Sequence, residues 1–226
     1  MKSQLPTKEE VKNLGKKLTN PMTSQFLMAS QKQFNQQKQT KLLDWELGKI
    51  KIFLLSGRIE AGKSTVAKIL VNALQTEYPT AIITVAGFAD GIKHVAHLVF
   101  GWDGIKDAKG RKLLQVVGTD AGRKYDNDIW VRKAYKDKIK SPIIIPNIVI
   151  FDDWRFPNEY DFWIDKPEIE KIYKIRVFRD EEIISNHESE WSLPTQGHPY
   201  YDYWFDNNGT KNQILPKVRE MLEELL

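Results

Sequence analysis

The sequence predicts an α/β protein in which a parallel sheet of about five strands carries helices on both faces. From residue 50 onwards, apolar runs of strand length alternate with segments of helical length, and these runs are rich in β-branched residues. Unbroken apolar strands are typical of parallel sheets, because such sheets are covered on both sides. The second observation is a glycine-rich turn between the first apolar run and the first helical segment.

Composition sets the broad class of the protein. Its 226 residues suffice for one substantial domain with an appendage. Because cysteine is absent, disulfides and thiolate metal sites are excluded. A net charge of +4 suits phosphorylated substrates but is too small to indicate nucleic-acid binding. The sequence has no run of about 18 apolar residues and no signal-peptide core, so we expect a cytoplasmic protein without a membrane span.

The first 48 residues differ from the rest and predict a helical N-terminal extension. Thr7 and Glu10 fit a capping box at the start of a short helix. A second helix is expected from about Thr23 to Leu47, although its middle, residues 31–41, is nearly all polar. This helix either wraps on the chain's own core or serves as an interaction arm. A homodimer is one arrangement that would cover its apolar ends.

A domain over residues 49–226 follows, with strands and helices in alternation. We expect strands over Ile50–Leu55, Ala81–Val85, Asn147–Phe151, Lys171–Phe178 and Tyr200–Phe205. We expect helices over Lys63–Gln75, Asp90–Phe100, Arg111–Tyr125, Ile129–Ile139, Pro157–Ile164 and Lys211–Leu225, with a turn-rich loop over residues 101–110.

Residues 57–65, GRIEAGKST, match the phosphate-binding loop pattern G-x-x-x-x-G-K-[ST] between the first strand and the first helix. Gly57 and Gly62 allow the backbone to turn its N–H groups inward, and the helix N-terminus attracts anions. Lys63 can reach phosphate oxygens, and the Ser64 hydroxyl suits Mg²⁺. The residues expected around the phosphates of ATP are Gly57, Arg58, Glu60, Ala61, Gly62, Lys63, Ser64 and Thr65.

The third strand ends in Asp152 and Asp153, followed by Arg155. Carboxylates at the carboxyl end of a buried strand commonly orient Mg²⁺ and its waters, so both are candidates for a magnesium site with Ser64. Either could instead cap the following turn. The Arg155 guanidinium can bind phosphate in bidentate geometry, or it can form a surface salt bridge with Glu159.

Two further segments, about residues 88–140 and 179–198, are expected to bind substrate or to form a lid. In the first, Asp90 and Lys93 stand one helical turn apart, and Arg123 follows a glycine-containing stretch. Trp130 suits either base stacking or a core position. In the second segment, HESE at residues 187–190 follows Arg179; one histidine without cysteine makes a metal site there improbable.

Together these segments resemble the deoxynucleoside monophosphate kinases of bacteriophages, which belong to the P-loop nucleotide kinases. The resemblance rests on six segments and covers roughly residues 50–225, whereas residues 1–48 have no counterpart in it. The segments are GRIEAGKST, GFADGIK at 87–93, LLQVVGTDAGRK at 113–124, DIWV around Trp130, FDDWRFPNE at 151–159 and HESE at 187–190.

The resemblance implies transfer of the γ-phosphoryl group of ATP to a deoxynucleoside monophosphate, with Mg²⁺ as cofactor, in the cytoplasm of the host if the protein is phage-encoded. It implies catalytic roles for Lys63, Arg155, Arg179 and Asp153, and magnesium binding by Ser64, Asp152 and Asp153, partly through water. The residues expected to bind the substrate are Phe88, Asp90, Lys93, Arg123, Trp130, Arg155 and Glu190.

Two other functions remain compatible with the residues. A kinase of another phosphorylated metabolite would carry the same P-loop and arginines, and base-stacking aromatic residues would be the difference. A P-loop ATPase coupled to nucleic acid would bind it through the N-terminal extension. That extension carries eight lysines against four acidic residues and few interleaved aromatic residues, which makes nucleic-acid binding unlikely.

Overall fold

The computed structural model describes residues 48–140, 145–180, 188–194 and 200–226, which belong to a compact unit over Gly48–Leu226. The expectations for helices in residues 1–47 lie outside the described residues. No helix in the described ranges is both long enough and apolar enough to cross a membrane.

Five parallel strands form the centre of this unit in the order β2-β3-β1-β4-β5. The strands are β1 (Ile50–Ser56), β2 (Ile83–Ala86), β3 (Ile148–Phe151), β4 (Ile169–Phe178) and β5 (Tyr203–Asp206). The parallel five-stranded sheet expected from the sequence is therefore confirmed. β1 lies in the middle, with Leu54 in register with Phe151 of β3 and Lys174 of β4.

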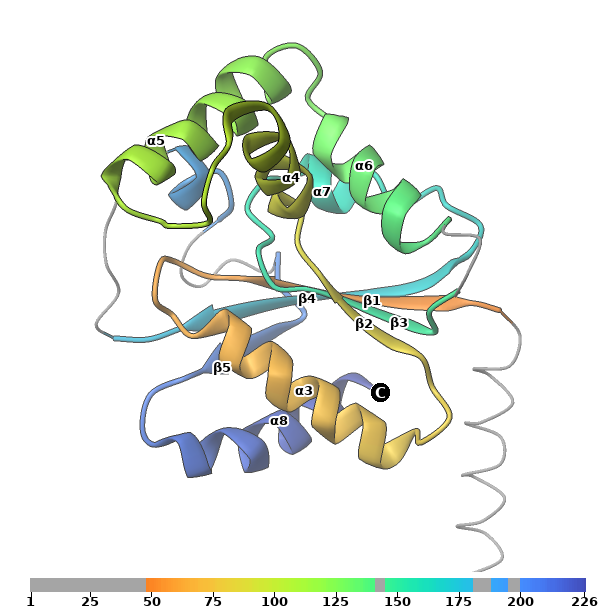
Figure 1. Ribbon diagram of the computed structural model, residues 1–226. Coiled ribbons are helices and arrows are strands. Elements are labelled where there is room, and N and C mark those ends of the chain that lie inside the picture. The colour runs from red at the N-terminus through yellow and green to blue at the C-terminus, as the bar shows by residue number, and fades with distance from the viewer. Residues whose placement is uncertain (1–47, 141–144, 181–187, 195–199) are drawn as a thin grey trace, which may run out of the picture. The chain divides into compact units, whose positions relative to one another are not determined.

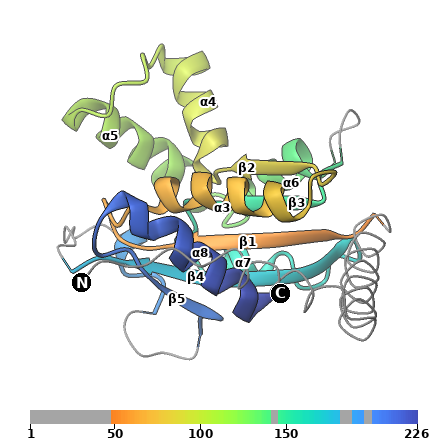
Figure 2. The same ribbon diagram turned by 90° about the horizontal axis from the view of Figure 1, so that it is seen from below.

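Helices cover both faces of this sheet (Figure 1). α4 (Ala89–Phe100), α6 (Ile129–Lys138) and the short α7 (Asn158–Asp161) lie on one face, with α5 (Ala108–Gln115) beside α4. α3 (Lys63–Glu77) and α8 (Lys211–Leu225) lie on the other face and pack against each other, as Figure 2 shows from below.

The core on the α4–α6 face is aromatic. Phe151 stacks on Phe88 at 4.3 Å between ring centroids, and Trp154 and Trp163 are fully buried in the same cluster. Every residue of β3 is buried, and β1 is buried except for the partly exposed Lys51. Strands buried on both faces explain why their sequences show no alternation of polar and apolar residues.

The segment expected as one helix over Arg111–Tyr125 divides into two parts. α5 begins earlier, at Ala108, because the Asp107 side chain accepts a hydrogen bond from Gly110 N at 2.7 Å and caps the helix. A π-helical stretch, η1 (Val116–Arg123), then continues it. A β-carbon at Gly122 would lie 2.6 Å from the indole nitrogen of Trp130, so this glycine permits the indole to pack against the stretch.

The other differences are at element ends. α7 spans four residues where the sequence predicts Pro157–Ile164, and β5 begins at Tyr203, three residues later than expected. After α7 the chain forms turns, with hydrogen bonds from Trp163 N to Tyr160 O and from Ile164 N to Asp161 O. These turns explain why the sequence pattern predicts a helix as far as Ile164.

The loop over residues 57–64, named the P-loop here after its sequence pattern, requires a glycine where it approaches β4. Gly57 has φ +152°, and a β-carbon there would lie 2.4 Å from the Val177 carbonyl oxygen. Gly101 also has positive φ, +64°, but a β-carbon there would meet nothing within 4 Å. An alanine at Gly57 would therefore meet both steric overlap and backbone strain, whereas an alanine at Gly101 would meet backbone strain alone.

We expect Gly57→Ala to lower the free energy of unfolding by roughly 2–4 kcal/mol, because overlap with a backbone carbonyl adds to the conformational cost. Gly101→Ala is the matched control and should cost only about 1 kcal/mol. Urea unfolding followed by circular dichroism measures both. Equal losses for the two variants would contradict the steric explanation.

Candidate functional site

The P-loop connects β1 to α3 and folds around the side chain of its own lysine. Gly62 and Glu60 both have positive φ, +87° and +65°, which turns the backbone back before the helix. Lys63 Nζ donates to Gly57 O at 2.8 Å and to Arg58 O at 2.7 Å. A non-glycine residue such as Glu60 in this conformation stores backbone strain, which is common at functional sites.

Ser64 and Asp152 meet across the carboxyl ends of β1 and β3. Ser64 Oγ donates to Asp152 Oδ2 at 2.6 Å. A hydroxyl and a carboxylate oxygen fit Mg²⁺, which keeps waters and phosphate oxygens as its remaining ligands. Among the described residues, no group of three or more His, Cys, Asp or Glu side chains could hold a metal ion.

Asp153 has a different position from its neighbour. Its two carboxylate oxygens accept hydrogen bonds from Phe88 N at 2.8 Å and from Ala89 N at 3.0 Å, where α4 begins. Burial raises the pKa of this carboxyl group, and the two backbone N–H groups oppose the rise. Asp153 therefore caps the start of α4, a role that the sequence did not predict for it, and Asp152 is left as the magnesium candidate.

Lys63 is buried among other charged groups. Burial lowers its pKa to about 8, helped by the Arg155 and Arg176 guanidinium groups and opposed by the carboxylates of Glu190 and Asp152. Three cations thus face two carboxylates around the loop. This excess of positive charge favours binding of an anion.

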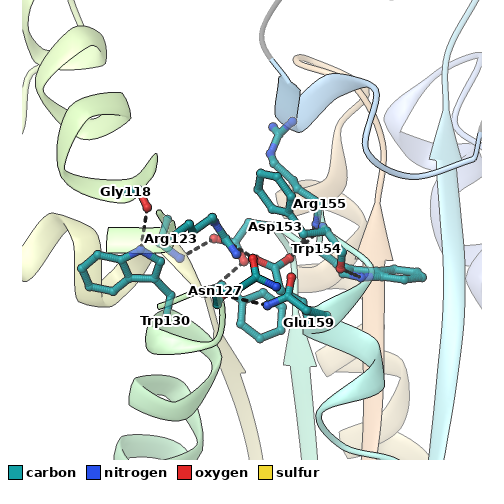
Figure 3. A network of polar contacts seen from close by, with 12 residues as sticks. Gly118, Arg123, Asn127, Trp130, Asp153, Trp154, Arg155 and Glu159 are labelled. Carbon is teal, nitrogen blue, oxygen red and sulfur yellow. Dashed lines mark hydrogen bonds and ion pairs between the residues drawn. The ribbon is translucent and has the colours of Figure 1, made fainter. Parts of the chain in front are cut away.

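Arg155 and Glu190 lie over the first half of the P-loop. Arg155 Nη1 forms a close ion pair with Glu190 Oε1, and Glu190 Oε2 accepts a hydrogen bond from Ile59 N at 3.1 Å. The Arg155 side chain points away from Glu159 (Figure 3) and pairs with Glu190 instead. The alternative prediction of a surface salt bridge between Arg155 and Glu159 is therefore wrong. Glu190 instead joins the loop to the arginine.

Arg123 and Glu159 form a buried ion pair on the β3 side of the site (Figure 3). Arg123 Nη2 lies 2.5 Å from Glu159 Oε1, and Glu159 Oε2 accepts from the backbone nitrogens of Arg155 and Phe156. The Arg123 guanidinium also stacks on the Phe156 ring at 3.9 Å. Its buried Nη1 has no hydrogen-bond partner among the described residues. Arg123 therefore orders the loop after β3.

Asp90 and Lys93 form a half-exposed pair at the start of α4. Lys93 Nζ lies 3.0 Å from Asp90 Oδ1, and Asp90 Oδ2 accepts from Gly87 N at 3.0 Å. Asp153 and Asp152 lie close enough to help raise the pKa of Lys93. These two predicted residues thus lie beside the β3 carboxylates.

Two of the residues expected to contact the nucleoside are inside the protein. Phe88 is 2% exposed and stacks on Phe151. Trp130 is 5% exposed, and its indole nitrogen donates to Gly118 O at 2.8 Å (Figure 3). Neither ring is exposed for stacking on a base, and Trp130 occupies the core position that the sequence also allowed.

Arg179 follows β4, whereas Arg155 follows β3, and these two strands flank β1. Arg179 is exposed at the end of β4, and its Nε donates to Asn207 O at 3.4 Å. Asn207 in turn donates from Nδ2 to Ala61 O of the loop at 2.8 Å. Arg179 is therefore connected to the loop through Asn207, whereas Arg155 is connected to it through Glu190.

Sequence reasoning missed two polar residues at this site. Arg176 is a buried arginine at the end of β4, and its position between Ile175 and Val177 in an apolar strand was an available signal. Asn207 follows β5 and fills the space beside Gly62, where a β-carbon would lie 2.1 Å from Asn207 Nδ2. Nothing in the local sequence distinguishes this asparagine from an ordinary turn residue.

Comparison of the chain with protein-family models and with curated proteins finds no match.

We expect Arg123→Met to lower the free energy of unfolding by about 3–5 kcal/mol at pH 8, because it leaves the Glu159 carboxylate buried without its cation. Burial already raises the pKa of Glu159 to about 7, so ionising this carboxyl group in the folded protein costs stability as pH rises towards and through that value. Losing the opposing arginine raises this pKa further. The destabilisation should therefore be smaller at pH 6, where Glu159 takes up a proton.

Urea unfolding at pH 6 and pH 8 measures this difference. Lys124→Met is the control, because Lys124 forms an exposed ion pair with Asp120, with side chains 70% and 48% exposed. It should change stability little at either pH. A loss for Arg123→Met that is the same at both pH values would contradict the buried-charge explanation.

Proposed function

We propose that the protein is an ATP-dependent deoxynucleoside monophosphate kinase. The observation that carries the proposal is the 2.6 Å hydrogen bond between Ser64 Oγ and Asp152 Oδ2 beside a P-loop that encloses Lys63. This combination of hydroxyl, carboxylate and lysine suits a nucleoside triphosphate with Mg²⁺. The choice of acceptor rests on the resemblance of the surrounding segments to the phage kinases.

On the donor side, the N-terminus of α3 and the P-loop backbone would bind the phosphates of ATP. Lys63 would exchange its two carbonyl partners for phosphate oxygens. Ser64 and Asp152 would hold Mg²⁺, which neutralises charge on the phosphates. Asn207 and Arg179 lie beside the loop at the ends of β5 and β4 and are candidates for contact with the rest of the donor nucleotide.

On the acceptor side, Arg155 is the candidate for binding the 5′-phosphate. Lys93 and Asp90 are half exposed next to the β3 carboxylates, so they are available to a bound nucleotide. Because Phe88 and Trp130 are used in the core, selection of the nucleoside would depend on polar contacts of this kind. Hydrogen-bonding sites discriminate strongly between analogues, since a missing partner leaves a polar group unpaired.

The reaction needs no covalent intermediate. An oxygen of the acceptor phosphate would bond to the γ-phosphorus of ATP while the bond from that phosphorus to the β–γ bridging oxygen breaks, giving ADP and a deoxynucleoside diphosphate. The acceptor phosphate is already ionised, so no strong general base is required. The protein's contribution is to align the two anions and to balance their charge.

The direct test is ADP formation with Mg·ATP against a panel of ribo- and deoxynucleoside monophosphates. We expect turnover only with some deoxynucleotides, and a loss of roughly 100-fold or more in Lys63→Met, which lacks the phosphate-binding cation. Lys68→Met, an exposed lysine on the same helix, is the matched control and should keep its activity. Turnover with other phosphorylated metabolites alone would identify a different kinase, and acceptor-independent hydrolysis an ATPase.

The pH dependence of nucleotide binding tests the role of Lys63 separately. Its pKa of about 8 means that the ammonium group loses its charge as pH rises above that value. Anion binding needs the charged form, so the dissociation constant of Mg·ADP should rise above pH 8 by up to about tenfold per pH unit.

Titration calorimetry from pH 6.5 to 9.5 would measure this dependence. In Lys63→Arg the charge persists across the whole range, because a guanidinium does not deprotonate. The dissociation constant of that variant should therefore stay level. Parallel pH profiles for both proteins would show that another group titrates.

A further inference from the structure

A short 3₁₀ turn, η2 (Glu188–Glu190), and the residue after it lie against the P-loop. Glu190 accepts a hydrogen bond from Ile59 N at 3.1 Å. The Arg58 guanidinium lies over the Trp191 ring, 4.8 Å from its centroid. The last residue of the turn and the residue after it thus contact two successive residues of the loop.

The Glu190 carboxylate sits in a binding site for an anion. Its side chain is 2% exposed, and its two oxygens take hydrogen bonds from different donors, Ile59 N and the Arg155 guanidinium. The Lys63 ammonium group is close enough for the Glu190 charge to act on it. A backbone N–H, a guanidinium and an ammonium group are the donors that typically bind phosphoryl oxygens.

The position within the loop indicates which phosphoryl group this site fits. The N–H groups at the start of α3, from Lys63 onwards, suit the inner phosphates of a nucleotide. Ile59 lies in the first half of the loop, four residues before Lys63, and Arg155, which follows β3, shares the Glu190 carboxylate with it. An anion held by Ile59 and Arg155 is therefore on the acceptor side of the loop, where the terminal phosphoryl group belongs.

We propose that the Glu190 carboxylate occupies the position of the donor's terminal phosphoryl group, so that a nucleoside triphosphate must displace it whereas a nucleoside diphosphate need not. The inference rests on the nucleotide binding proposed above. A carboxylate and a phosphate cannot share these donors, because their like charges repel at contact distance. Arrival of the triphosphate thus releases Arg155 from its internal partner, so that its guanidinium becomes available to phosphate oxygens of either substrate.

The test compares dissociation constants for Mg²⁺ complexes of ADP and of the non-hydrolysable triphosphate AMP-PNP by titration calorimetry. Glu190→Gln removes the competing charge, so the triphosphate should bind about tenfold more tightly, while ADP affinity should change much less. Glu188→Gln is the matched control, because it makes the same charge change on the exposed side of the same turn. It should alter neither constant.

A second measurement does not depend on how Glu190→Gln folds. If the triphosphate displaces Glu190, the adjacent Trp191 should leave Arg58. The difference in fluorescence between wild type and Trp191→Phe should then change with AMP-PNP and stay constant with ADP. An equal gain in affinity for both nucleotides in Glu190→Gln, or a loss for the triphosphate, would overturn the inference, as would a Trp191 signal that responds equally to both.

Binding of inorganic tripolyphosphate tests this inference separately from the proposed function, because tripolyphosphate can occupy the phosphate positions without a site for a nucleoside. Tighter tripolyphosphate binding by Glu190→Gln, with no nucleotide bound by either protein, would keep the anion site and reject the nucleotide kinase. Equal binding of tripolyphosphate to wild type and Glu190→Gln would reject displacement of Glu190 even if the kinase activity is found.

Discussion

The parallel pairing of β1 with β3 determines where the groups of the site stand. β3 ends at Phe151, in register with Leu54, and β1 continues two residues further to Ser56, so Asp152 and the P-loop follow at the same edge of the sheet. That register brings Ser64 of α3 within 2.6 Å of Asp152. A shift of β3 by one residue would turn the Asp152 side chain to the opposite face of the sheet, because side chains alternate along a strand.

Three polar side chains at the loop, those of Lys63, Ser64 and Glu190, have internal hydrogen-bond partners. Lys63 donates to loop carbonyls, Ser64 donates to Asp152, and Glu190 accepts from Ile59 and Arg155. These partners keep buried polar groups satisfied, which matters because an unpaired one costs roughly 1–3 kcal/mol. Binding at this site is therefore an exchange of partners, and its free energy is the difference between two sets of contacts.

Much of the sheet could be predicted because its information is local. Apolar runs identified the five strands, and the spacing of Gly57, Gly62 and Lys63 identified the loop. What could not be predicted depends on contacts between distant segments. The burial of Trp130 follows from packing against Gly118 and Gly122, and the different roles of two adjacent carboxylates follow from which backbone N–H groups face each one.

Asp152 and Asp153 are adjacent in the sequence, yet their side chains contact different helices. One carboxylate contacts Ser64, and the next one holds the first turn of α4 through two hydrogen bonds of 2.8 and 3.0 Å. A single peptide unit therefore links the P-loop helix with the helix that carries Asp90 and Lys93. Because that unit is planar, the Cα atoms of the two aspartates keep a fixed separation, so the magnesium candidate and the cap of α4 share one anchor at the end of β3.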